Sequence, residues 1–170
     1  MKKVLTAVLS MALLAGCAGT AAPKKAATKK LKIGIGSVSN LKSKELKNNK
    51  GSVQFNTTIA TVVLEGDVIK YLSFDVAQNT STFDGAGKFT SNHSKTLTKK
   101  EKKDDYGMKK ISKIGKEWYE QAEALEKWAI GKKVSDFKNM KTKKSSHGMK
   151  TAETDLQTSV TIGVDRFLAS

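Results

Sequence analysis

Several residue types on which familiar sites depend are scarce in this chain of 170 residues, which contains one cysteine, two histidines and one proline. A lone cysteine excludes a disulfide within the chain and leaves no set of cysteine ligands for a metal. The two histidines, His93 and His147, lie among small polar residues, without a carboxylate or cysteine at ligand spacing. The Gly-x-Ser-x-Gly turn of many hydrolases is also missing. The sequence therefore supports neither a metal site nor a hydrolase mechanism.

Arginine is scarcer still, because Arg166 is the only one among 31 basic residues, and the 16 acidic residues leave a net charge of +15. Proteins that read nucleic acids rely on arginine forks and on aromatics that stack on bases. This chain has neither an arginine cluster nor alternating basic and aromatic residues, so we expect no nucleic-acid partner. A lysine-rich surface would instead be attracted to anionic lipid or a cell-wall polymer. The alternative is that lysine runs such as TKKEKK are simply solvated.

Long apolar runs are absent too, since the one near the start, residues 4–16, is too short to span a bilayer. It follows Lys2 and Lys3 and ends in small residues, which is typical of a secretory signal. The letters LAGC, ending at Cys17, resemble the lipobox of bacterial lipoproteins. That resemblance implies cleavage before Cys17, a diacylglycerol thioether on its sulfur and an acylated amino terminus. The alternative is an ordinary secretory signal with a chance cysteine.

This interpretation divides the chain into three parts. We expect a lipoprotein signal peptide over residues 1–16, a lipidated cysteine and flexible Lys/Ala stalk over residues 17–30, and a single domain over residues 31–170. Each buried methylene of the acyl chains contributes roughly 0.8 kcal/mol, so two chains hold a protein at a membrane where one is marginal. The expected location is extracytoplasmic, with the lipid anchor in a membrane of the bacterial cell envelope. Removing Lys2 and Lys3 lowers the net charge to +13.

The first half of the domain reads as strands. Residues 53–65 and 68–78 are rich in β-branched and aromatic residues, and EGD between them predicts the turn of an antiparallel hairpin. FDGAGKF, residues 83–89, has the composition of another turn. An earlier strand fits LKIGIGSVS, residues 31–39. Its GIG lacks the third glycine and the following helix of a dinucleotide-binding loop, so we interpret it as strand.

The second half reads as helices. Thr98 and Glu101 have the spacing of a capping box and predict a short helix. A longer helix is expected over residues 115–130, with Gly131 as its end and an apolar face of Trp118, Ala122, Leu125 and Ala129. The predicted fold class is therefore α+β, with antiparallel hairpins from the first half packed against helices from the second half in a single domain.

The carboxyl-terminal segment fits two patterns. Leu156, Val160, Val164, Phe167 and Leu168 fall on one helical face, whereas Val160, Ile162 and Val164 would line one face of a strand. The helix accounts for more residues, and we predict it. On either interpretation these aliphatic side chains belong to the core.

Three clusters, TKKEKKDDYGMKK, GKEWYEQAEALEKW and TDLQTSVTIGV, resemble bacterial lipoproteins related to the FMN-binding domains of extracytoplasmic electron-transfer flavoproteins. The resemblance spans roughly residues 53 to 168 as a pattern of hairpin, helix and terminal motif. It implies FMN as cofactor, a flavin transferase and redox proteins as partners, and a role as redox carrier or binding protein rather than catalyst.

The terminal motif carries the attachment chemistry that the resemblance implies. In flavinylated members a threonine hydroxyl receives FMN as a phosphodiester from a magnesium-dependent flavin transferase. The matching positions of this chain are Asp155, Thr158, Ser159 and Thr161, with Thr161 as the acceptor. Two positions depart from the pattern: Leu156 stands where glycine is frequent, and Val160 stands where alanine is usual. The bulk of valine is an obstacle to loading, and "TSVT" also has the alternative interpretation of a chance match within a structural segment.

Aromatic side chains complete the candidate site. Tyr106, Trp118 and Tyr119 could stack on a flavin, although aromatics on a helix are more often part of the core. Two functions therefore stay open. One is a lipid-anchored FMN carrier, in which the flavin supplies the electron chemistry. The other is a cofactor-free surface lipoprotein that binds a ligand, wall polymer or partner through its basic surface.

Overall fold

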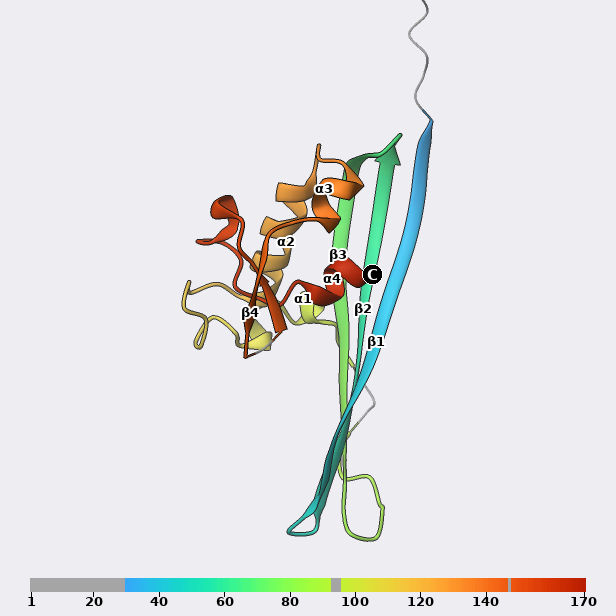
Figure 1. Cartoon of the computed structure of the whole chain (residues 1–170). Helices are drawn as coiled ribbons and strands as arrows, with labels where there is room; N and C mark the ends of the chain where they lie inside the picture. Colours follow the sequence, from blue (N-terminus) through green and yellow to red (C-terminus); the bar gives the residue numbers. More distant parts are fainter. Residues whose placement is uncertain (1–29, 93–95, 147) are drawn as a thin grey trace, which may run out of the picture.

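The computed structural model describes residues 30–92, 96–146 and 148–170. Cys17, the apolar segment before it, His93 and His147 lie outside the described residues. The first half forms a three-stranded antiparallel sheet of β1 (Leu31–Lys47), β2 (Lys50–Glu65) and β3 (Val68–Phe83), in the order β1-β2-β3. The second half contributes the helices, so the α+β fold predicted from the sequence is confirmed (Figure 1).

Two-residue turns join the three strands. Asn48 and Asn49 connect β1 to β2 with positive φ angles of 51° and 59°, which asparagine tolerates better than most residues. Gly66 and Asp67 connect β2 to β3, and Gly66 has φ 65°. The predicted hairpin is therefore confirmed, and so is the turn after Phe83, where the Gly87 N–H donates to the Asp84 carbonyl at 3.0 Å. The first strand exists but runs to Lys47, eight residues further than expected.

The helices cover one face of the sheet and only part of its length. They lie against the end that holds Gly66, while the end with the Asn48–Asn49 turn projects beyond them (Figure 1). On the covered face the strand pairing aligns Val62 with Leu72, Ala60 with Phe74 and Thr58 with Val76. The opposite face leaves Ile33 and Ile35 exposed.

The longest helix, α2 (Trp118–Ala129), presents the apolar face predicted for it, and Trp118, Ala122, Leu125 and Ala129 are all buried. It begins at Trp118 rather than near Gly115, because the backbone at Glu117 is extended and its N–H donates to the Glu120 carboxylate at 2.7 Å. The short helix α3 (Val134–Lys138) follows and buries Phe137. Phe74, from β3, packs against Phe137 and Phe167 with ring centroids 5.9 and 4.6 Å apart.

The helix α1 (Lys99–Lys102) has the predicted capping box: the Glu101 N–H donates to Thr98 Oγ1, and the Thr98 N–H donates to the Glu101 carboxylate. It continues into a 3-10 turn, η1 (Lys103–Tyr106). Both lie beside β3, the strand at one edge of the sheet. No helix in the described ranges has the length and apolarity needed to cross a lipid bilayer.

The predicted helix over residues 156–168 is wrong. The segment consists of a 3-10 turn, η2 (Thr154–Leu156), an irregular stretch, and a five-residue helix, α4 (Asp165–Ala169). In the irregular stretch the backbone N–H groups of Thr161 and Ile162 donate to a side chain of α2, and the Val164 N–H donates to the Met149 carbonyl. These tertiary bonds replace the helical ones. The aliphatic residues nevertheless belong to the core, as expected: Leu156, Val160, Ile162 and Val164 are buried, and Leu168 is half-buried against them.

A small hairpin of β4 (Thr142–Ser145) and β5 (Gly148–Thr151) was not predicted from the sequence. Its residues are mostly polar, so they lack the apolar alternation that identifies a half-buried strand. The Val164 N–H donates to Met149 within β5, which ties this hairpin to the carboxyl-terminal segment.

Candidate functional site

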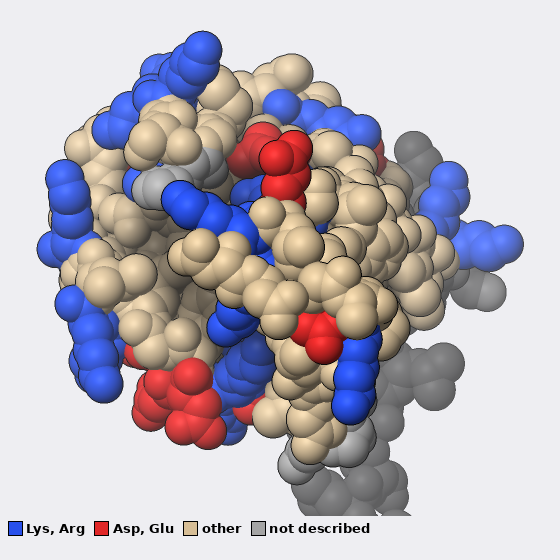
Figure 2. All heavy atoms as spheres, turned by 90° about the horizontal axis from the view of Figure 1, so that it is seen from below, with Lys and Arg blue, Asp and Glu red and all other residues tan. Residues whose placement is uncertain are grey.

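A cavity of about 780 Å³ opens where the covered face of the sheet becomes polar. It lies between Thr58 and Val76 on the sheet, Trp118 on α2, and the irregular stretch that contains Thr161. The loop after η1 and the β4–β5 hairpin form its rim. Figure 2 shows a hollow on the face seen from below, with Lys and Arg side chains on several sides of it. The volume is within the range of cavities that hold small molecules and cofactors.

Thr161 lines this cavity and is held from behind by Gln121. The Gln121 Oε1 accepts three hydrogen bonds, from the Thr161 N–H at 2.8 Å, the Thr161 hydroxyl at 3.1 Å and the Ile162 N–H at 3.2 Å. One side-chain oxygen therefore fixes both the backbone and the hydroxyl orientation of Thr161.

The Gln121 side chain is itself fixed, because it is fully buried on the apolar face of α2. Its amide nitrogen donates to the Lys116 carbonyl at 3.1 Å and to Ser112 Oγ at 3.3 Å. These bonds orient the amide so that its oxygen points toward the segment at Thr161. The Thr161 hydroxyl donates its proton to this oxygen and keeps both lone pairs for a further partner.

The other motif residues lie outside the cavity lining. Asp155 and Thr158 are exposed, Asp155 on η2 and Thr158 just after it. Ser159 is half-buried, and its hydroxyl donates to the Leu156 carbonyl at 3.3 Å. Val160 is buried and does line the cavity. The structure therefore brings Thr161, but not Asp155, Thr158 or Ser159, to the cavity wall.

Only one of the three candidate aromatic side chains lines the cavity. Trp118 is buried and lines the cavity, packed on Phe167 with ring centroids 6.1 Å apart. Tyr106 and Tyr119 do not line it. The Tyr106 hydroxyl donates to Gln78 Oε1 at 3.3 Å, and the Tyr119 hydroxyl reaches Asp104 at 3.5 Å. Burial, and then the charge of Glu117, raise the pKa of Tyr106 above its ordinary value.

The cavity lining is strongly basic. Five cationic side chains contribute to it, and Asp165 is its one acidic residue; the cations are Lys99, Lys113, Lys143, Lys150 and Arg166. Such a lining favours an anionic ligand, because cations arranged around a concave surface reinforce one another's potential.

Lys99 is half-buried and lies close to two aromatic rings. Its Nζ lies 5.3 Å from the ring centroid of Trp118 and 4.9 Å from that of Tyr106. Burial, and then the charges of Arg166, Lys102 and Lys42, lower the pKa of Lys99 to about 8, against a smaller opposite effect of Asp75. The structure thus holds an ammonium group in a place where its charge is poorly compensated.

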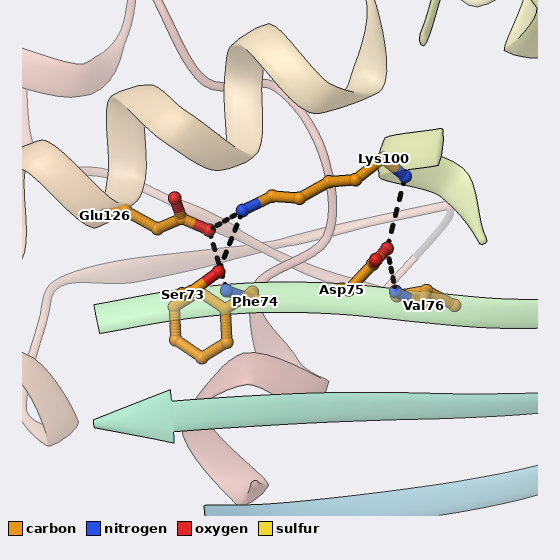
Figure 3. A network of polar contacts seen from close by, with 6 residues as sticks. All are labelled: Ser73, Phe74, Asp75, Val76, Lys100 and Glu126. Atoms are coloured by element: carbon orange, nitrogen blue, oxygen red, sulfur yellow. Dashed lines mark hydrogen bonds and ion pairs between the residues drawn. The ribbon is translucent and has the colours of Figure 1, made fainter. Parts of the chain in front are cut away.

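A polar network fixes the helix that carries Lys99. The next residue, Lys100, turns toward the sheet edge, where its Nζ donates to Glu126 Oε1 at 2.6 Å and to Ser73 Oγ at 3.0 Å (Figure 3). The same Glu126 oxygen accepts the Phe74 N–H at 2.7 Å, and the Lys100 N–H donates to Asp75 Oδ1 at 3.1 Å. These bonds satisfy an edge-strand N–H that no neighbouring strand pairs and hold α1 against β3.

Buried Glu117 holds the rim on the other side. Its carboxylate accepts the Met108 N–H at 2.8 Å and the Lys109 N–H at 2.9 Å, which anchors the loop after η1 to the start of α2. Met108, Ser112 and Lys113 of the same loop line the cavity. The rim is therefore tied to the same helix that positions Thr161.

The comparisons with known proteins found no significant match to a family model, a curated protein or a solved structure. Among the residues that the structure describes, no group of three His, Cys, Asp or Glu side chains lies close enough together to hold a metal ion.

Four residues of the site were not identified from the sequence: Gln121, Lys99, Thr58 and Arg166. Gln121 carried a usable signal, because it is the polar residue on an otherwise apolar stripe that runs from Trp118 to Leu125. Lys99 carried none, since it lies in a lysine run in which every member looks solvated.

Proposed function

We propose that this protein is a lipid-anchored, extracytoplasmic FMN-binding protein of a bacterial cell envelope, that it carries electrons, and that Thr161 is the site of flavin attachment. The observation that carries the proposal is the position of Thr161 in the wall of a cavity of about 780 Å³ lined by five cationic side chains and one acidic one. The resemblance of the terminal motif supplies the identity of the cofactor.

The residues of the cavity fit such a group. FMN combines a planar aromatic ring system with a phosphate, and the lining combines apolar surface from Trp118, Met108 and Val76 with the cationic side chains. Recognition of this kind needs a mostly apolar wall and a few well-placed polar groups. The flavin would supply the one-electron and two-electron chemistry, while the protein supplies binding, orientation and electrostatics.

The chain's own residues have separate roles in this proposal. Gln121 orients the Thr161 hydroxyl, whose oxygen would bond to the flavin phosphorus of a flavin dinucleotide donor as it loses its proton, while the pyrophosphate bond of the donor breaks and the nucleoside monophosphate leaves. The cationic lining compensates the remaining phosphodiester charge. Asp155 and Thr158, which are exposed near Thr161 in the sequence, belong to the surface that a flavin transferase would recognise.

The attachment is tested by co-expressing the protein with an active flavin transferase and measuring the intact mass. We expect one added FMN on the wild type and none on Thr161→Ala, while Thr161→Ser retains the hydroxyl and part of the loading. Thr154→Ala, at an exposed threonine outside the matched positions, is the control and keeps full loading.

Val160→Ala tests the departure from the family pattern. If the two extra methyl groups hinder the transferase, this variant is loaded more completely than the wild type. It should stay folded, because the substitution removes only two methyl groups from a buried position. Absence of flavin from both the wild type and Val160→Ala, with the transferase active on another substrate, contradicts the proposal and favours a cofactor-free lipoprotein.

The anchor is tested separately at Cys17. Cys17→Ser is expected to abolish incorporation of labelled fatty acid and to leave the signal peptide attached, because the thiol is the proposed site of lipid attachment. The mass and the membrane fraction of the two proteins are compared. An unchanged mass and unchanged lipid labelling in Cys17→Ser would contradict the anchor without bearing on the flavin.

A further inference from the structure

The lining of the cavity includes a buried hydroxyl, that of Thr58 on β2. Thr58 is 1% exposed, and its Oγ1 makes no hydrogen bond with any residue that the structure describes. A buried polar atom without a partner costs stability, so in native proteins it usually marks a place for an unseen water, ion or ligand.

Two cations line the same cavity without a carboxylate of their own. Within the described ranges, neither Lys99 nor Arg166 forms a salt bridge, whereas the adjacent Lys100 is paired with Glu126 at 2.6 Å. Lys99 and Arg166 are half-buried and close enough for the charge of Arg166 to disfavour that of Lys99. Two like charges held together inside a cavity are stabilised when an anion lies between them.

We propose that Thr58, Lys99 and Arg166 form a subsite for one phosphate group inside the cavity. A phosphate offers several acceptor oxygens, which suits an ammonium, a guanidinium and a hydroxyl donor at once. Asp165, the one acidic residue of the lining, sits next to Arg166 in sequence and offsets part of the positive charge. The inference deepens the proposed function and rests on it for the ligand, because FMN carries such a phosphate.

The subsite is tested by titrating the purified mature protein, free of flavin and held in neutral detergent micelles, with inorganic phosphate. Binding is followed by calorimetry at pH 7 and low ionic strength. We expect Lys99→Gln to weaken phosphate binding about ten-fold, as befits one charge-assisted hydrogen bond, and Thr58→Val to weaken it less. Lys127→Gln is the matched control, because it removes the same charge from a side chain that is exposed on the outer face of α2.

Two further arms identify the ligand and guard against misfolding. FMN is expected to bind more tightly than riboflavin to the wild type, and this preference disappears in Lys99→Gln. If Lys99→Gln does not fold, Arg166→Gln takes its place. Equal weakening by Lys127→Gln and Lys99→Gln, or the lack of any phosphate binding at low salt, overturns the subsite.

The outcomes separate the subsite from the proposed function. Phosphate binding that depends on Lys99 in a protein that never accepts flavin keeps the subsite and contradicts the flavin proposal. Full flavin loading on Thr161 together with phosphate affinity that is unchanged in Lys99→Gln and Arg166→Gln keeps the flavin proposal and contradicts the subsite.

Discussion

The covered face of the sheet differs sharply between its two ends. Near the Gly66 turn the aligned pairs are Val62 with Leu72 and Ala60 with Phe74, and the second cavity there, of about 230 Å³, is lined mainly by aliphatic and aromatic side chains. Further along the same strands the pair becomes Thr58 with Val76, and the larger cavity begins there with its basic lining. The same pair of strands thus supports an apolar core and a polar cavity.

This difference separates a region whose burial stabilises the fold from a region that contains charged and polar groups. The apolar end buries the side chains of Ile69, Leu72, Phe74 and Phe137. The hydrophobic effect makes this burial favourable without any directional bond. Within the part of the chain that the structure describes, the basic end holds a partly buried ammonium group without a salt bridge and a hydroxyl without a hydrogen bond, which both oppose folding in the absence of a ligand. The burial at the apolar end must therefore offset the unfavourable free energy of the basic end. Removing side chains at the two ends should change the free energy of unfolding in opposite directions.

The largest expected effect is at the apolar end. Phe74→Ala should lower the free energy of unfolding by about 3–5 kcal/mol, because Phe74 is 1% exposed and contacts Phe137 and Phe167. Urea titration followed by circular dichroism measures it. Tyr71→Ala is the control, since Tyr71 lies half exposed on the uncovered face of the same strand. Similar losses in both variants would show that burial at the apolar end adds no stability beyond that of an exposed ring, and the assignment of the stabilising role to that end would fail.

The next effect is at the junction of the two ends. Gln121→Leu should lower the free energy of unfolding by about 1–3 kcal/mol, because it leaves the Thr161 and Ile162 N–H groups without their acceptor. Gln121→Glu keeps an acceptor oxygen, but it buries a carboxylate and loses the donor to the Lys116 carbonyl, so it should cost at least as much. Amide hydrogen exchange at Thr161 and Ile162 should accelerate in Gln121→Leu more than exchange in β2. Unchanged exchange at those two amides would mean that Gln121 does not hold the segment.

The apolar end is also the part that the sequence predicts well. Alternation through Ala60, Val62 and Leu64 and the helical repeat from Trp118 to Ala129 are both signals of burial, and all these side chains contact the core. The strands and the helix were predicted because the apolar residues that recur along each of them are the ones that the fold buries. The hairpin, the helix α2 and the fold class follow from such local agreement.

The basic end is poorly predicted because its structure depends on contacts between distant residues. Val160, Val164 and Phe167 keep a helical repeat, but bonds from Thr161 and Ile162 to Gln121, 40 and 41 residues away, replace the helix there. Lys99 and Lys100 are neighbours of the same type, yet one faces the cavity and the other pairs with Glu126. Nothing in a run of lysines distinguishes them, because the distinction arises from the position of α1 at the sheet edge.

The smallest expected effect is a gain at the basic end. Lys99→Met should raise the free energy of unfolding of the protein without ligand by about 1 kcal/mol at pH 7, because it removes a poorly compensated charge. The loss of the ammonium contacts with two aromatic rings offsets part of this gain. Burial lowers the pKa of Lys99 to about 8 in the folded protein, against 10.5 for the ordinary side chain. Between these values the unfolded chain binds more protons, so the contribution of Lys99 to stability rises with pH.

The advantage of Lys99→Met over the wild type should therefore shrink between pH 8 and pH 10, where the wild-type side chain becomes neutral in the folded state. Lys127→Met, at an exposed site, supplies the control and should show no such trend. Thermal unfolding of the three proteins at pH 7, 8.5 and 10 measures the differences. Saturating phosphate should reverse the order at pH 7, because an anion next to the ammonium group compensates the repulsion between Lys99 and Arg166. A Lys99→Met protein that is less stable than the wild type without phosphate would show that the basic end contributes to folding by itself, and the division of the sheet into a stabilising end and a binding end would fail.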